Sequence, residues 1–209
     1  MARTANSFKR PAPRFRPQPT VLVLCEDSKS GKKYIEDAAF HFRSNAKVEV
    51  AHCGVTHPSG IVAEAIRRKS KFDTIYCVVD RDEHKCFDRA ILMAKDHKNI
   101  ELIKSFPCFE FWLLLHFGFS RKPFSRSGSY SAGDNVNREL KQKNGMNTYD
   151  KKADINYFGL LLGEKFDTAR QLAPRVMEDA VESGESNPST ELHLLINKLE
   201  ELGTPIPAA

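Results

Sequence analysis

Residues 72–84, FDTIYCVVDRDEH, decide the fold and carry the first sign of chemistry. The apolar run at 75–79 is rich in β-forming residues and predicts a buried strand. It ends in Asp80-Arg81-Asp82, so two acids directly follow the strand. Like charges this close repel unless a cation lies between them, and carboxylate oxygens suit Mg²⁺ or Mn²⁺. The motif therefore predicts a divalent metal site, although a solvated loop after a core strand explains it at least as well.

The rest of the chain alternates strand-like and helix-like patterns from Thr20 onward. Short apolar runs predict strands at 21–25, 47–52, 75–79 and 100–104, and apolar residues at helical spacing predict a helix after each strand. This alternation predicts an α/β fold with a mostly parallel sheet flanked by helices on both faces.

Composition divides the 209 residues into three expected parts. We expect a flexible basic arm at 1–19, an α/β core at 20–118, and a basic loop plus helical extension at 119–209 that packs on the core. No apolar run approaches the roughly 18 residues of a membrane span. The five cysteines are scattered without any CxxC pair, which favours free thiols in a reducing cytosol and predicts a cytoplasmic protein.

Local signals also predict where three helices begin. Ser59 precedes one helical pattern and Asp134 precedes another. Asn187-Pro188 combines a capping residue with proline at the first helical position. We therefore expect a helix to begin at each of these places.

The net charge of +5 is concentrated at the N-terminus. The arm contains five basic residues and no acid, which leaves 27 basic against 27 acidic residues elsewhere. Such tails contact nucleic-acid phosphates, and a solubilising terminus without a partner is the equally open alternative. The predicted nucleic-acid-binding residues are Arg3, Lys9, Arg10, Arg14 and Arg16.

A third acid, Glu26, follows the first predicted strand. Ligands in open parallel sheets gather beyond the carboxyl ends of the strands. If the first and third strands are neighbours, Glu26 and Asp80 share one edge, and Asp82 can face the same space. We therefore predict Glu26, Asp80 and Asp82 as ligands of Mg²⁺ or Mn²⁺. A helix-start role for Glu26 is the alternative.

Two further residues extend this candidate site. Glu110 is the only acid in the apolar run at 108–117, and a lone buried carboxylate needs either a metal or a salt bridge. His116 falls on a different helical face, where a core or capping role is expected. Lys29, just past Glu26, is the first choice to hold a phosphate, with charge balance on a solvated loop as the alternative.

Four motifs make the chain resemble the RloB-like family of Toprim-fold proteins. The family's motif CEG-x-KTE-xx-Y is similar to 25–31 with Tyr34, and its Val-Asp-x-Asp motif to 79–82. Its Pro-Cys-Phe-Glu-x-Trp-Leu-Leu-Leu-His motif resembles 107–116, and its Asn-Pro-Ser-Thr motif resembles 187–190. The resemblance implies a Toprim-like (Rossmann-like) fold and Mg²⁺-dependent cleavage or joining of phosphodiester bonds.

The first motif departs from the family pattern at two positions. Gly31 stands where the family often has a second glutamate, and Asp27 replaces the usual glycine. The change either removes a ligand of a second metal or moves that role to Asp27.

The resemblance further implies a nuclease of RNA or DNA in anti-phage defence, encoded beside an AAA-type ATPase. The first hypothesis is a metal-dependent phosphodiesterase whose catalytic residues are Glu26, Asp80, Asp82, Glu110 and Lys29. The second is an inactive nucleic-acid-binding or regulatory subunit that works with the ATPase. The third is a toxin that the ATPase must activate.

Overall fold

The computed structural model describes residues 19–44 and 47–204. Five strands form one sheet in the order β2-β1-β3-β4-β5, in which β1 to β4 run parallel and β5 is antiparallel to β4. The strands are β1 (Val21–Cys25), β2 (Val48–His52), β3 (Thr74–Asp80), β4 (Ile100–Phe106) and β5 (Ser189–Thr190). The predicted α/β class with a mostly parallel sheet is confirmed.

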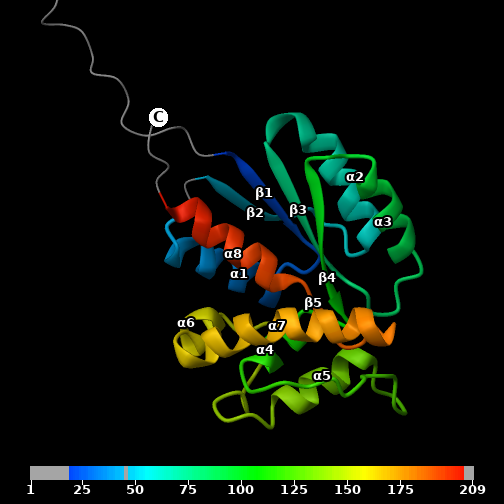
Figure 1. Cartoon of the computed structure of the whole chain (residues 1–209), viewed down its shortest axis with the longest axis vertical. Coiled ribbons are helices and arrows are strands. Elements are labelled where there is room, and N and C mark those ends of the chain that lie inside the picture. The colour runs from blue at the N-terminus through cyan, green and yellow to red at the C-terminus, as the bar shows by residue number, and fades with distance from the viewer. Residues whose placement is uncertain (1–18, 45–46, 205–209) are drawn as a thin grey trace, which may run out of the picture.

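Helices cover both faces of this sheet, as Figure 1 shows. They are α1 (Ser30–His41), α2 (Pro58–Arg68), α3 (Phe87–Lys95), α4 (Glu110–Leu115), α5 (Ala132–Leu140), α6 (Tyr157–Leu161), α7 (Glu164–Ser183) and α8 (Leu192–Gly203), with a short 3₁₀ turn, η2 (Lys69–Lys71), after α2. Successive side chains of a strand point to opposite faces, so each strand feeds two cores. In β1, Leu22 and Leu24 pack with α2 and α3, whereas Val21, Val23 and Cys25 pack with α1, α4 and α8.

The central strands are buried along almost their whole length, which matches their continuous apolar sequences. All five residues of β1 are at most 1% exposed, and Ile75 to Val79 of β3 are buried. β1 lies between β2 and β3, and Cys25 pairs with Val78. This register brings the residue after β1 beside the end of β3, and so positions the candidate site.

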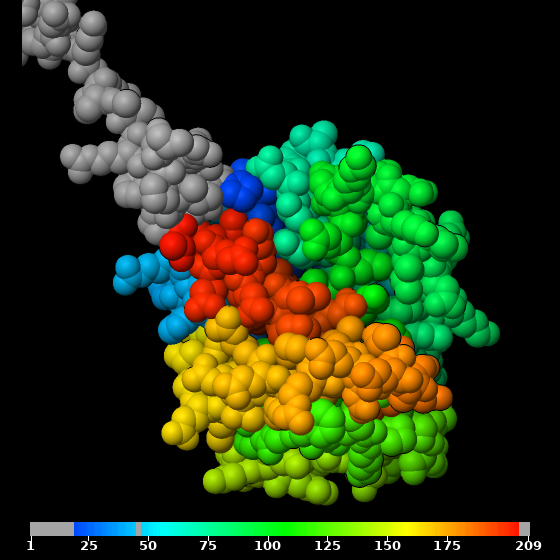
Figure 2. All heavy atoms as spheres, in the orientation of Figure 1, coloured from blue at the N-terminus to red at the C-terminus, as the bar shows by residue number. Residues whose placement is uncertain are grey.

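The C-terminal helical part returns to the sheet instead of standing apart. β5 pairs with the end of β4, and α8 packs against α1 and β4. α7 lies across the end of the sheet beside α4, and Figure 2 shows it packed directly against α8. None of the helices within 19–44 and 47–204 combines the length and apolar character that crossing a bilayer demands. The five cysteines are all unpaired.

Two of the three predicted helix starts are displaced by a few residues. His57, not Ser59, caps α2, because its Nδ1 accepts the N–H of Gly60 at 3.1 Å and Pro58 occupies the first helical position. Ser131, not Asp134, caps α5, and the Asp134 carboxylate accepts the N–H of Ser131 in return. Both helices therefore begin with a side-chain cap, but at a neighbouring residue.

The predicted helix start at Asn187-Pro188 is wrong. The chain there forms β5, in which Ser189 and Thr190 pair with Phe106 and Ser105 of β4. The next helix begins only at Leu192, whose N–H donates to Thr190 Oγ1 at 3.2 Å. Long-range strand pairing thus outweighs the local capping signal.

Candidate functional site

Glu26 and Asp80 meet at the carboxyl edge of the sheet. β1 and β3 are neighbours, so Glu26, the residue after β1, lies beside Asp80, the last residue of β3. Glu26 Oε2 accepts the backbone N–H of Asp80 at 2.9 Å, and Glu26 Oε1 lies 2.7 Å from His84 Nε2. The predicted sharing of one edge by these two acids is therefore what the structure shows.

Both carboxyl groups are held in surroundings that disfavour their charge. Burial raises the pKa of Asp80 well above its ordinary value, and the carboxylates of Glu110 and Glu26 add to this effect. Burial also raises the pKa of Glu26, although the Asp80 N–H and His84 act in the opposite direction. The edge thus gathers acidic groups whose ionised forms the described residues only partly stabilise.

Glu110, the first residue of α4, is the most buried of these acids, at 1% side-chain exposure. Its Oε1 accepts hydrogen bonds from Tyr149 Oη at 2.9 Å and Ser30 Oγ at 3.3 Å, and it lies 2.9 Å from Lys151 Nζ. Its Oε2 is buried without a hydrogen-bond partner. The sequence predicted either a metal or a salt bridge as the partner of Glu110. The structure shows the salt bridge to Lys151 and leaves Glu110 Oε2 without a partner.

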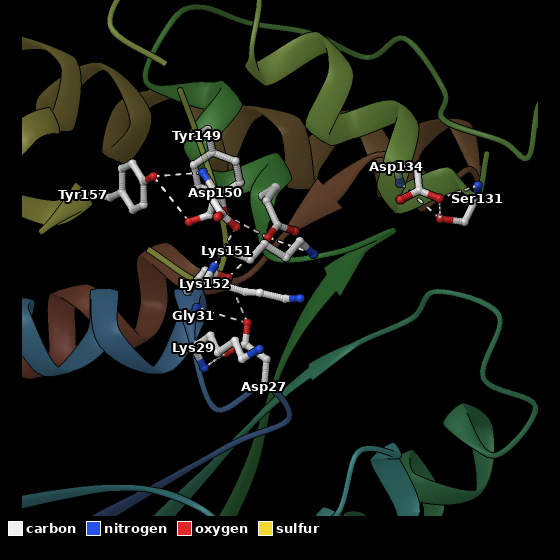
Figure 3. A network of polar contacts seen from close by, with 12 residues as sticks. Asp27, Lys29, Gly31, Ser131, Asp134, Tyr149, Asp150, Lys151, Lys152 and Tyr157 are labelled. Atoms are coloured by element: carbon white, nitrogen blue, oxygen red, sulfur yellow. Dashed lines mark hydrogen bonds and ion pairs between the residues drawn. The ribbon is translucent and has the colours of Figure 1, made fainter. Parts of the chain in front are cut away.

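Lys151 is the main residue that the sequence did not reveal. Its side chain is 43% exposed and comes from an irregular segment after α5 to lie 2.9 Å from Glu110. Figure 3 shows Lys151 below Tyr149 and Asp150 in this segment. Burial lowers the pKa of Lys151, but the nearby carboxylates of Glu110 and Asp80 outweigh burial and raise it. The ammonium group therefore stays charged and supplies a cation at this edge.

Glu26, Asp80, Lys29 and Lys151 line one open pocket of about 290 Å³. We call it the acidic pocket. Asp82 does not line it. Its backbone N–H donates to Pro107 O at 2.9 Å, its φ is +30°, and its side chain is exposed. The structure therefore brings Lys29 into one pocket with two of the predicted acids, Glu26 and Asp80. Glu110 does not line this pocket but lies 2.9 Å from the Nζ of Lys151, which does.

The remaining predicted residues lie elsewhere. Arg3, Lys9, Arg10, Arg14 and Arg16 fall outside the described residues. His116 is a core histidine: its Nδ1 lies 3.0 Å from Trp112 O, its Nε2 lies 3.3 Å from Tyr34 Oη, and burial lowers its pKa to about 4.

A family model described as RloB-like protein matches residues 21–199. The chain belongs to the RloB-like family. No curated protein and no solved structure matches it.

The two positions at which this RloB-like chain departs from the family pattern lie against each other. A Cβ on Gly31 would lie 3.5 Å from Asp27 Oδ2 and 3.4 Å from the Phe109 ring. The Asp27 carboxylate therefore stands beside the space where a side chain at position 31 would begin. It accepts the N–H groups of Lys29 at 2.9 Å and Gly31 at 3.1 Å, as well as Ser30 Oγ at 2.9 Å.

Asp27 thereby caps the start of α1, and its replacement tests this role. We expect Asp27→Ala to lower the free energy of unfolding by about 1 kcal/mol, because the first N–H groups of α1 lose their acceptor. Asp27→Asn retains an acceptor oxygen and should lose about half as much or less. Urea denaturation of the three proteins measures the difference. Equal stabilities of Asp27→Ala and wild type would contradict the capping role.

The donor chemistry of this RloB-like site fits a divalent cation. Glu110 has an unsatisfied buried oxygen, and Asp80 and Glu26 both have raised pKa values that a nearby cation would lower. Within 19–44 and 47–204, however, no three His, Cys, Asp or Glu side chains converge closely enough to hold a metal ion. Glu26 is instead turned to Asp80 N–H and His84, and Glu110 to Lys151. A metal would have to displace these partners.

Proposed function

We propose that this RloB-like protein is a metal-dependent phosphodiesterase that cleaves RNA or DNA. The observation that carries the proposal is the acidic pocket, in which Glu26 and Asp80 share the carboxyl edge of a parallel sheet beside two lysines. Glu26 and Asp80 would hold Mg²⁺ or Mn²⁺. Asp82, which is exposed outside the pocket, and Glu110, which is paired with Lys151, would have to turn toward the metal to complete the site. The bound metal would activate water and neutralise the scissile phosphate.

The chain's own residues supply the other parts of this chemistry. Lys29 and Lys151 both line the pocket, and in this proposal their ammonium groups hold a phosphate and stabilise the charge of its transition state. His84 fixes Glu26 through the 2.7 Å contact between Nε2 and Oε1. The basic arm would add salt-dependent contacts to nucleic-acid phosphates.

A second candidate function rests on a specific observation. Because no three ligands converge among the described residues, the chain is also suited to be a nucleic-acid-binding or regulatory subunit without turnover. An AAA-type ATPase is the proposed partner in either case, in a cytoplasmic anti-phage defence system. Activation by that ATPase would rearrange the acidic pocket, as expected for a toxin that is inert alone.

Nuclease assays separate these functions. We expect the purified chain to cleave single-stranded or duplex RNA or DNA with Mg²⁺ or Mn²⁺, and not with EDTA. Glu26→Gln should reduce the rate by at least about 100-fold, because it removes a proposed ligand charge. The proposal fails if no metal supports cleavage, both alone and after co-expression with the neighbouring ATPase. It also fails if Glu26→Gln cleaves as fast as wild type.

A further inference from the structure

A second pocket, of about 370 Å³, adjoins the acidic pocket and has no role in the chemistry described so far. Its lining includes Tyr130, Arg138, Lys141, Lys151 and Lys152, and we call it the Tyr130 pocket. Lys151 lines both pockets, so the two form neighbouring parts of one surface. Figure 3 shows Lys151 and Lys152 between Tyr149 on one side and Asp27 with Lys29 on the other.

The lining of the Tyr130 pocket contains exposed cationic side chains that a ligand can contact. Arg138, Lys141 and Lys152 are exposed, and none of them forms a salt bridge in the part of the chain that the structure describes. The two acids of the lining are already engaged. Asp134 accepts the N–H and Oγ–H of Ser131 at 2.9 and 2.8 Å, and Asp150 accepts the N–H of Lys152 at 2.9 Å. These hydrogen bonds leave both carboxylates charged, but the cations of the lining outnumber the two acids, so the pocket presents a positive surface that suits phosphate groups.

Tyr130 adds an aromatic platform to this positive surface. Tyr130 is 46% exposed, although large aromatic residues usually gain by burial. The Arg138 guanidinium lies 4.5 Å from the ring centroid and so supports one side of the ring. An exposed ring beside several cations that form no salt bridge among the described residues is typical of sites that bind single-stranded nucleic acid, because every base has a face that can stack. Bases inside a duplex are not available for such stacking.

We propose that the Tyr130 pocket binds an unpaired stretch of a nucleic-acid strand next to the phosphate held in the acidic pocket. One base stacks on Tyr130, and Arg138, Lys141 and Lys152 contact the adjacent phosphates. Lys151, at the boundary, contacts the phosphate that enters the acidic pocket. This inference rests on the proposed function, and it defines the substrate of that function as a single strand or an unpaired loop.

Fluorescence anisotropy of the full chain in EDTA tests the inference without any cleavage. The probes are fluorescein-labelled single-stranded RNA and DNA of one sequence and the matching duplexes. We expect Tyr130→Ala to weaken binding of a single strand by about 5- to 100-fold, and Tyr130→Phe to bind like wild type because the ring is retained. Neutral variants of Arg138, Lys141 and Lys152 should each reduce the salt dependence of binding, whereas the matched control Lys95→Gln, on α3, should not.

Two outcomes would overturn the inference: Tyr130→Ala binds single strands as tightly as wild type, or Tyr130→Ala weakens duplex binding just as much. Thermal unfolding of each variant verifies that it is folded, which is expected because Tyr130 is exposed. These outcomes differ from a failure of the proposed function. In that case no metal would support cleavage, but binding of single strands in EDTA would still depend on Tyr130.

Discussion

Asp80→Asn is expected to reduce metal-dependent cleavage by at least about 100-fold and, at the same time, to stabilise the metal-free protein. The side chain is held close to the carboxylates of Glu110 and Glu26, which together with burial raise its pKa. In the folded metal-free protein Asp80 avoids this repulsion by keeping a proton that the unfolded chain releases, whereas asparagine is neutral in both states and keeps the shape of the side chain. We expect a gain of at least about 1 kcal/mol in the free energy of unfolding, or roughly 2–4 °C in Tm for a chain of this size.

The pH dependence of the free energy of unfolding tests the raised pKa of Asp80 independently. Since the pKa of Asp80 is raised by burial above the ordinary 3.8, the folded protein retains a proton that the unfolded chain has released. Folding therefore takes up a proton, and stability falls as pH rises from the ordinary pKa through the raised one. As pH rises from 3.8 toward the raised pKa in EDTA, wild type should lose stability more steeply than Asp80→Asn.

Asp82→Asn is the matched control for these stability measurements. Asp82 lies two residues further along the chain, but its side chain is exposed, so loss of its charge should change stability by less than about 0.5 kcal/mol. Added Mg²⁺ should stabilise wild type more than Asp80→Asn, because a ligand stabilises the state that binds it. Parallel pH curves for wild type and Asp80→Asn, with equal stabilities, would show that Asp80 is not under electrostatic strain.

The sequence allowed part of this site to be predicted because local patterns show which strands are buried on both faces. The apolar runs of β1 and β3 are buried on both faces and belong in the centre of a parallel sheet. Once they are neighbours, Glu26 and Asp80 must share an edge. Glu110 was also open to prediction, since a single acid in an apolar helix requires a partner.

The residues that the sequence did not reveal come from segments without periodicity. Lys151 and Tyr149 lie in an irregular stretch after α5, and only tertiary packing brings them to Glu110. His84 lies in the turn after β3, where no pattern distinguishes a contact to Glu26 from a solvated side chain. At 187–190, the local helix signal was overridden by pairing with β4, which no local pattern encodes.

Lys151→Met is expected to lower the free energy of unfolding by about 1–3 kcal/mol, since it leaves the buried Glu110 carboxylate with only Tyr149 and Ser30 as partners. The loss should stay below the largest values known for buried ion pairs, because the Lys151 side chain is 43% exposed and water screens part of the interaction. Urea denaturation in EDTA measures this loss.

The Glu110→Gln background isolates the ion pair from other effects of Lys151. Without a negative charge at position 110, Lys151→Met should lose less than about 0.5 kcal/mol, and the difference between the two backgrounds is the coupling energy of the pair. Equal losses in both backgrounds would mean that Lys151 stabilises the fold through other contacts.

Metal binding should act on the same carboxylate. If a divalent cation is held near Glu110, it takes over the charge compensation that the Lys151 ammonium provides in this structure. Mn²⁺ should then restore more stability to Lys151→Met than it adds to wild type, because only in wild type must the ion compete with an ammonium group. Equal stabilisation of the two proteins by Mn²⁺ would show that the metal does not bind near Glu110. Glu110 would then serve only as the partner of Lys151 in the salt bridge.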